Sequence, residues 1–178
     1  MENFKSGFVS IIGRTNVGKS TLINGLVHEK VAITTSKAQT TRTAIKAIVN
    51  RPNSQIIFID TPGIHKPRTK LGETMIDTAF GTIPNVDVNL FIVEAVDDTI
   101  GKGDRIILDK IKEAGKQTIL VINKIDLIKK EKLLKLMELY SAEYEFAAII
   151  PVSALKGENL ELLFLEIEKY LPQRTGIL

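Results

Sequence analysis

The sequence contains no cysteine among its 178 residues, so the chain can form neither a disulfide framework nor a thiolate metal site. It also has no apolar stretch near the about 18 residues that a membrane-spanning helix needs. The chain begins with Glu2 and Asn3, where a signal peptide carries positive charge, and the apolar run that follows is short. We therefore expect a soluble protein, and the lack of cysteine fits a reducing compartment.

The sequence also has only a small net charge. The 24 Lys and Arg residues exceed the 21 Asp and Glu residues by a net charge of +3, which permits a nucleic-acid partner but does not argue for one. Repeats, low-complexity segments and long linkers are absent from the sequence. With 44% hydrophobic residues, this length supports one domain with a sizeable core, and it is too short for two full domains.

Six apolar runs of strand length are present, and they alternate with amphipathic helical stretches. Several are apolar at nearly every position, as strands buried on both faces of a sheet are. The short, turn-rich segment 50–54 joins the second run to the third, which favours an antiparallel hairpin. The runs cover residues 8–12, 45–49, 56–59, 88–93, 119–122 and 147–152.

The helical stretches carry apolar residues on one face. The last helix has five such residues, and Asn159 is its candidate N-cap. This alternation predicts an α/β fold with a mixed, mostly parallel six-stranded sheet and helices on both faces. Ligands of such sheets bind at the carboxyl ends of strands. The apolar faces are Ile107, Leu108 and Ile111; Leu133, Leu136, Met137 and Tyr140; and Leu160, Leu163, Phe164, Ile167 and Leu171.

Residues 13–20, GRTNVGKS, fit the phosphate-binding pattern G-x-x-x-x-G-K-[ST] between an apolar run and the helical stretch 21–27. Backbone N–H groups of such a loop converge on phosphate oxygens, and the helix N-terminus adds a favourable dipole. Lys19 would reach the β- and γ-phosphates, and Ser20 would bind Mg²⁺. The alternative is a glycine-rich turn. The nucleotide-binding residues predicted here are Asn16, Val17, Gly18, Lys19, Ser20 and Thr21.

Two further segments would act on the phosphates and the metal. Asp60 follows the run 56–59 and would hold the Mg²⁺ shell through water, while the Gly63 N–H would meet the γ-phosphate; Asp-x-Pro-Gly is also a common turn. Residues 37–42, KAQTTR, contain threonines that could complete the Mg²⁺ shell only when the γ-phosphate is present, which would make the segment a switch. The alternative for this segment is a solvated loop.

The segment NKID after the run 119–122 predicts guanine recognition. Guanine presents N1–H and a 2-amino group side by side, and the Asp126 carboxylate can accept both, which adenine cannot offer. Asn123 would bond N7, and the Lys124 stem would cover the base. Backbone N–H groups at Ser153 and Ala154 would reach O6. A polar turn before a helix is the alternative.

The motifs, in this order, resemble the signature set of GTPases, and they imply the P-loop NTPase fold of small G proteins. More closely, the chain resembles the Era family of bacterial GTPases over about residues 6–172. We expect residues 1–172 to form the GTPase domain and residues 173–178 to form a tail. The matching segments are GRTNVGKSTLINGLV, KAQTTR, DTPGIHKPRTKLGE, NKIDL and VSALKGENL.

The resemblance implies a molecular switch that binds GTP or GDP with Mg²⁺ and hydrolyses GTP slowly. It also implies a role in 16S rRNA processing and 30S ribosomal subunit assembly. The protein would be a cytoplasmic monomer, and the resemblance also permits peripheral membrane association. Era continues into an RNA-binding KH domain, which we expect to be missing from this sequence, since it ends at Leu178. The alternative function is a non-catalytic docking module that responds to guanine nucleotides.

For catalysis, the resemblance implies Lys19, Asn16 and Thr41, with Thr41 also a Mg²⁺ ligand. Related GTPases bind K⁺ through an asparagine that matches Asn16 and through carbonyls that match Thr35, Lys37 and Thr40, which implies a K⁺ site here. The alternative is that Asn16 closes its own turn. Two departures stand out: Thr15 replaces a proline, and Ile64 stands where many small GTPases carry the glutamine that orients water. Four further side chains are candidate catalysts, but for each of them we expect a solvent-facing position: Arg14, Arg42, His28 and His65.

Overall fold

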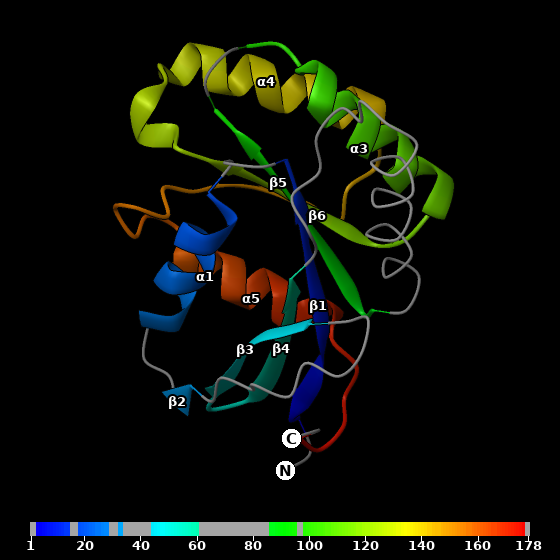
Figure 1. Cartoon of the computed structure of the whole chain (residues 1–178), viewed down its shortest axis with the longest axis vertical. Coiled ribbons are helices and arrows are strands. Elements are labelled where there is room, and N and C mark those ends of the chain that lie inside the picture. Colours follow the sequence, from blue (N-terminus) through cyan, green and yellow to red (C-terminus); the bar gives the residue numbers. More distant parts are fainter. Residues whose placement is uncertain are drawn as a thin grey trace.

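The computed structural model describes residues 3–14, 18–28, 32–33, 44–60, 86–95 and 98–176. In this part of the chain a central sheet has the strand order β2-β3-β4-β1-β5-β6-β7 (Figure 1). The strands are β1 (Lys5–Gly13), β2 (Ala32–Ile33), β3 (Ala44–Arg51), β4 (Ser54–Asp60), β5 (Val88–Glu94), β6 (Thr118–Asn123) and β7 (Ala148–Pro151). The helices are α1 (Lys19–His28), α3 (Lys102–Ala114), the 3₁₀ helix η2 (Ile125–Leu127), α4 (Lys130–Glu143) and α5 (Leu160–Tyr170).

The strand pairing confirms the predicted mixed, mostly parallel sheet. Strand β1 lies parallel to both β4 and β5, and β5, β6 and β7 continue in parallel. Strands β3 and β4 form the expected antiparallel hairpin. The six predicted strands are all present, and the two-residue β2 pairs antiparallel with the outer edge of β3. A strand this short carries no period that the sequence could reveal.

Two hydrophobic clusters cover opposite faces of the sheet, because neighbouring strand residues point to opposite sides. Val9 and Ile11 of β1 join α1 and α5 in one cluster, whereas Ile12 joins α3 and α4 in the other. Figure 1 shows the same division, with α1 and α5 together on one side of the strands and α3 and α4 on the other. The predicted placement of helices on both faces is therefore confirmed.

The β3–β4 hairpin is joined to α5 through Arg51. Its guanidinium bonds the Glu161 carboxylate at 2.8 Å and the Glu168 carboxylate at 3.0 Å. Its central carbon lies 4.3 Å from the centroid of the fully buried Phe164 ring. Burial and a cation–π contact therefore coincide at one aromatic side chain.

Asn159 occupies the N-cap position of α5, as predicted, but its side chain makes no capping hydrogen bond. Its φ of 63° is left-handed, a conformation that asparagine tolerates better than most residues. The side-chain amide instead donates to the Pro151 carbonyl at 2.8 Å. Asn159 thus ties the start of α5 to the end of β7.

The described part of the chain ends beside the strand with which it begins. Gln173 pairs with Lys5, and the Arg174 N–H donates to the Phe4 carbonyl at 3.1 Å. Arg174 also forms an ion pair with Asp87 at 3.2 Å. The Ser6 hydroxyl of β1 donates to the Thr175 carbonyl at 2.7 Å, so the described residues of the predicted tail lie against the start of β1.

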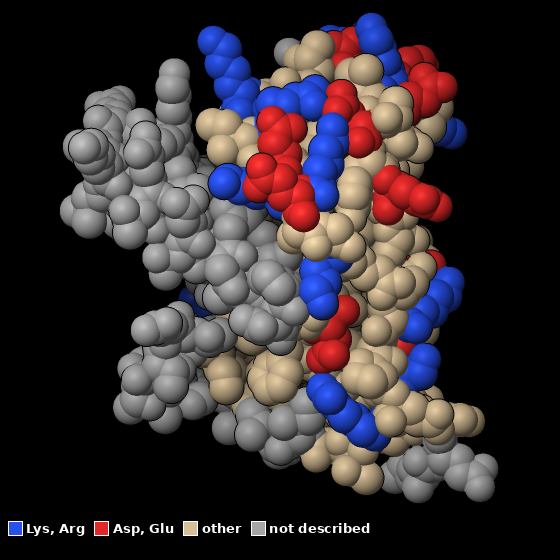
Figure 2. Space-filling view, turned by 90° about the vertical axis from the view of Figure 1, so that its right-hand side faces the viewer, with Lys and Arg blue, Asp and Glu red and all other residues tan. Residues whose placement is uncertain are grey.

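Acidic and basic side chains are interspersed on the described part of the face shown in Figure 2. The net charge of +3 is thus not gathered there into a basic surface. No helix in the described ranges is long and apolar enough to cross a membrane.

Phe164→Ala should lower the free energy of unfolding by about 3–5 kcal/mol, because it removes a fully buried ring and leaves a cavity. The matched control is Leu165→Ala on the same helix, where the side chain is 47% exposed and the expected change is within about 0.5 kcal/mol. Urea denaturation of both variants checks the prediction. Equal losses would mean that the α5 contact with the sheet does not depend on Phe164.

Candidate functional site

Side chains from three predicted motifs meet at the carboxyl ends of β1, β6 and β7. The chain passes from β4 across β1 to β5, so β1 is the point at which the strand order changes direction, where open α/β sheets bind ligands. A cavity of about 200 Å³ lies here. Its lining residues are Gly18, Thr21, Asn123, Lys124, Asp126, Leu127, Ser153 and Leu155.

Asn123 connects these motifs. It is the last residue of β6 and is only 2% exposed. Its Oδ1 accepts the Ala154 N–H at 3.0 Å, and its Nδ2 faces Gly18, where an added Cβ would lie 2.6 Å away. The side chain therefore fixes the spacing between the phosphate loop and the loop after β7.

Lys124 is held by Glu94, which belongs to none of the predicted motifs. Its Nζ lies 2.8 Å from Oε1 of Glu94, the last residue of β5. The Lys124 backbone has a φ of 67°, a left-handed conformation that costs a non-glycine residue about 1–2 kcal/mol. The sequence signal for Glu94 is a carboxylate at the end of a mostly apolar strand, but its pairing with Lys124 depends on β5 and β6 being neighbours.

Asp126 is exposed and is oriented by Ser153. The buried Ser153 hydroxyl donates to Asp126 Oδ1 at 2.9 Å and accepts the Lys156 N–H at 3.2 Å. The Ile125 N–H donates to the Val152 carbonyl at 3.3 Å. The short helix η2 and the loop after β7 therefore hold the carboxylate at the mouth of the cavity.

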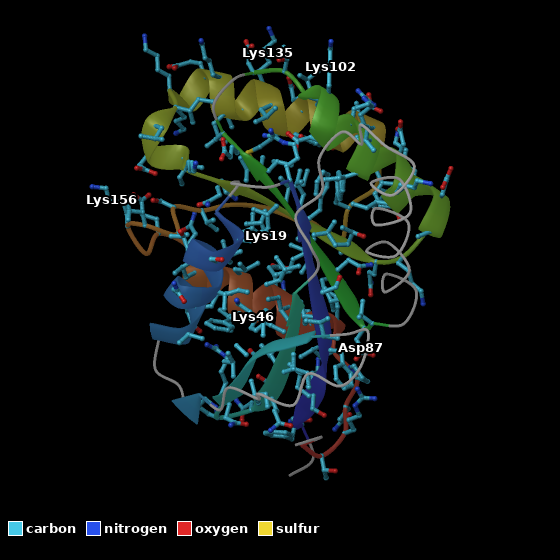
Figure 3. The ribbon with its side chains drawn as sticks, viewed as in Figure 1. Lys19, Lys46, Asp87, Lys102, Lys135 and Lys156 are labelled. Atoms are coloured by element: carbon cyan, nitrogen blue, oxygen red, sulfur yellow. The ribbon has the colours of Figure 1, made fainter. Side chains whose placement is uncertain are left out.

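The described part of the phosphate loop leads directly into α1. Gly18 has a φ of +88°, and its carbonyl accepts the Leu22 N–H at 2.8 Å. Lys19 and Ser20 form the first turn of the helix, and Lys19 lies where α1 approaches the centre of the molecule (Figure 3). The N–H groups and the dipole of this helix end favour an anion.

The predicted metal site is described only in part. Ser20 is exposed in the first turn of α1, and Asp60 ends β4 beside β1, in register with Ile11. Among the described residues no group of three acidic, histidine or cysteine side chains could hold a metal. The predicted site residues outside the described ranges are Asn16, Val17, Thr41 and Gly63, together with Thr35, Lys37, Thr40, Arg42 and His65.

The sequence predicts a solvated Arg14 side chain, but the structure places it in an ion pair. Its Nε bonds Oδ1 of Asp104 in α3 at 2.8 Å. Asp104 is 5% exposed, and burial raises the pKa of its carboxyl group, while the hydrogen bond from Arg14 opposes that rise. No sequence motif could reveal this contact, because ninety residues separate Arg14 from Asp104 along the chain.

Gly18→Ala should destabilise the protein more than Gly115→Ala. Both glycines have positive φ, so each substitution costs about 1–2 kcal/mol in the backbone. At Gly115 a Cβ would meet nothing within 4 Å, whereas at Gly18 it would meet the Asn123 amide. Unfolding free energies in urea measure the difference. If the two variants lose the same unfolding free energy, the Asn123 side chain moves aside without a measurable penalty and does not fix the phosphate loop.

Comparisons with known proteins agree with this geometry. The family described as 50S ribosome-binding GTPase matches residues 8–124. GTPase Era of Caldanaerobacter subterraneus subsp. tengcongensis is 49% identical over 170 residues, which are 96% of this chain and 57% of that protein. GTPase Era of Syntrophus aciditrophicus is 51% identical over 170 residues, 96% of this chain and 55% of that protein. The chain thus spans little more than half the length of these relatives.

Two solved structures share the fold over 98% of this chain and 60% of their own. A point variant of Aquifex aeolicus Era bound to GDP·AlF₄⁻ is 41% identical, with a TM-score of 0.80. Era in complex with MgGDPNP and nucleotides 1506–1542 of 16S ribosomal RNA is 42% identical, with a TM-score of 0.81. The chain therefore belongs to the 50S ribosome-binding GTPase family, and it shares its sequence pattern and fold with Era GTPases over almost its whole length.

Proposed function

We propose that this protein binds guanine nucleotides and hydrolyses GTP. The observation that carries the proposal is the convergence of Gly18, Asn123, Asp126 and Ser153 on one cavity. Two of the side chains are oriented before any ligand arrives, Asn123 by the Ala154 N–H and Asp126 by the Ser153 hydroxyl. A pocket with preset polar groups binds without paying for their ordering.

Asp126 would select guanine. A carboxylate has two oxygens with about four acceptor sites, and the Ser153 hydroxyl uses one of those on Oδ1. The remaining acceptor sites suit the adjacent N1–H and 2-amino donors of guanine. The exposed Leu127 and Leu155 line the same cavity and would contact the base and the stem of Lys124.

The first turn of α1 would bind the phosphates. Lys19 would place its ammonium on the β- and γ-phosphates, and the N–H groups of Gly18 and of the following residues would bond phosphate oxygens. Ser20, Thr41 and Asp60 would hold Mg²⁺, whose preference for hydroxyl and carboxylate oxygens suits this donor set. When bound, the ion neutralises charge between the β- and γ-phosphates.

Hydrolysis would then depend on electrostatic stabilisation rather than on a positioned glutamine. Ile64 stands where many small GTPases carry that glutamine, and Lys19 supplies positive charge where negative charge develops. The expected unassisted rate is on the order of 10⁻⁴–10⁻² s⁻¹. A phosphate-release assay distinguishes this enzyme from a module that binds guanine nucleotide without hydrolysis.

The cellular role that we propose is assembly of the small ribosomal subunit in the cytoplasm, including 16S rRNA processing. Its support is the 42% identical Era that binds nucleotides 1506–1542 of 16S rRNA. Residues 1–172 would form the GTPase domain, followed by the tail 173–178. By itself, this chain, which we propose to be a monomer, should bind rRNA only weakly and with strong salt dependence, as surface Lys and Arg residues do.

Asp126→Asn should reduce GTP affinity at least tenfold, because it removes a charged acceptor whose hydrogen bonds are worth about 1.5–3 kcal/mol each. Xanthine has a carbonyl in place of the 2-amino group, and the asparagine amide can donate to it. The variant should therefore prefer xanthosine triphosphate over GTP. Titration of both nucleotides against variant and wild type measures the exchange.

The control is Asp109→Asn, an exposed carboxylate on α3 outside the cavity, which should leave both affinities unchanged. Unchanged GTP affinity in Asp126→Asn would remove the assignment of the base pocket.

K⁺ would be a further cofactor, held by Asn16 and by carbonyls of residues 35, 37 and 40. Hydrolysis should then be faster in K⁺ than in Na⁺ at equal ionic strength, since Na⁺ is too small to span such ligands. Asn16→Ala should remove this difference and preserve GDP affinity. Equal rates in the two salts, with the variant no slower than wild type, would reject the cation and favour an external activator.

A further inference from the structure

The strand that leads into the phosphate loop is attached to α3 by one ion pair. Arg14 directly follows Gly13, the last residue of β1, and its Nε bonds Asp104 Oδ1 at 2.8 Å. Asp104 lies in the first turn of α3, where the helix dipole favours a carboxylate. The pair therefore joins the N-terminal turn of α3 to the residue that begins the loop.

Gly103 provides the space that this contact needs. A Cβ built at Gly103 would overlap Cδ of Arg14 and would lie 3.2 Å from its Cγ. The arginine stem thus lies directly on the backbone of α3. Any side chain at residue 103 would displace the stem and with it the guanidinium.

Burial makes the ion pair costly to break. The side chain of Asp104 is 6% exposed and that of Arg14 is 34% exposed. Removing one member of a buried pair leaves an uncompensated charge, whereas removing both members does not. The two residues should therefore act as a unit in a double-mutant cycle.

The Asp104 carboxylate also lies within electrostatic reach of the Glu94 carboxylate, which is the partner of Lys124. The charge of Glu94 acts on Asp104, and Glu94 in turn holds Lys124 at 2.8 Å. Arg14, Glu94 and Lys124 stand at the carboxyl ends of the adjacent strands β1, β5 and β6, and Asp104 of α3 is paired with Arg14. Each of the two carboxylates has its own cation.

We propose that Arg14 is a positioning residue for the phosphate loop, locked by Asp104 and Gly103 onto the first turn of α3. This role rests on the proposed function, because Arg14 would fix the position of the loop that would bind the phosphates. An arginine finger would have to leave Asp104 and point to the γ-phosphate. The positioning role predicts similar effects on GDP and GTP, since both nucleotides carry the α- and β-phosphates around which the loop backbone would close.

The experiment measures GDP and GTP affinity and single-turnover hydrolysis at saturating GTP in the full chain. Arg14→Ala and Asp104→Ala should each weaken both nucleotides about tenfold, and the double variant should be no weaker than the weaker single variant. Asp104→Asn keeps the Oδ1 acceptor and should recover most of the affinity. Hydrolysis at saturation should fall less than affinity does.

Gly103→Ala separates loop positioning from damage to the fold. Alanine favours a helix over glycine by about 1 kcal/mol, so α3 should be no less stable, yet the added methyl group displaces the Arg14 stem. This variant should also weaken GDP and GTP to a similar extent. The control is Arg105→Ala on the same helix, which removes the ion pair with Glu143 at 2.7 Å and should leave both affinities within about twofold.

Each contrary outcome is distinct. A loss in hydrolysis of about 10³-fold or more for Arg14→Ala, with GDP affinity intact, would identify an arginine finger instead. Additive effects of Arg14→Ala and Asp104→Ala, or wild-type affinity in Gly103→Ala, would overturn the lock. Wild-type protein that binds no guanine nucleotide would reject the proposed function itself, and this inference would fall with it.

Discussion

The site depends first on the hydrogen bond between the Asn123 side chain and the Ala154 N–H, at 3.0 Å. An amide buried to 2% exposure must satisfy its polar atoms internally, and an unsatisfied one would cost about 1–3 kcal/mol. This requirement fixes the end of β6 against the loop after β7. It also places the amide against Gly18, so the phosphate loop and the base loop share one side chain.

Two carboxylates and two cations extend this arrangement along the edge of the sheet. Lys124 bonds Glu94, and Arg14 bonds Asp104. Lys124 of the NKID segment is thereby attached to β5, and Arg14, which leads into the phosphate loop, is attached to α3. Both bonds hold long, flexible side chains in single orientations, whose ordering is entropically costly when a ligand must supply it. Hydrophobic packing thus places the strand ends, and polar contacts set the loops upon them.

Much of this could be predicted from the sequence. Apolar runs such as residues 88–93 identify strands because both of their faces are buried. The prediction that Asp126 binds guanine needs only the chemistry of one side chain, so it can be made without the fold. The partners of Lys124 and Arg14 could not be found in this way, since Glu94 and Asp104 meet them only after β1, β5 and β6 assemble. The Asn159 side chain bonds Pro151 rather than capping α5, which likewise depends on a left-handed backbone that the sequence does not display.

The central claim is that one carboxylate at a preset position recognises two donors on guanine. Competition binding of GTP, ITP and ATP to the wild-type protein tests it most directly, because inosine lacks only the 2-amino group and adenine lacks both donors. The account predicts that ITP binds about 10- to 100-fold more weakly than GTP, as expected for one lost hydrogen bond to a charged acceptor, and that ATP binds more weakly still. Equal affinity for the three nucleotides would contradict it.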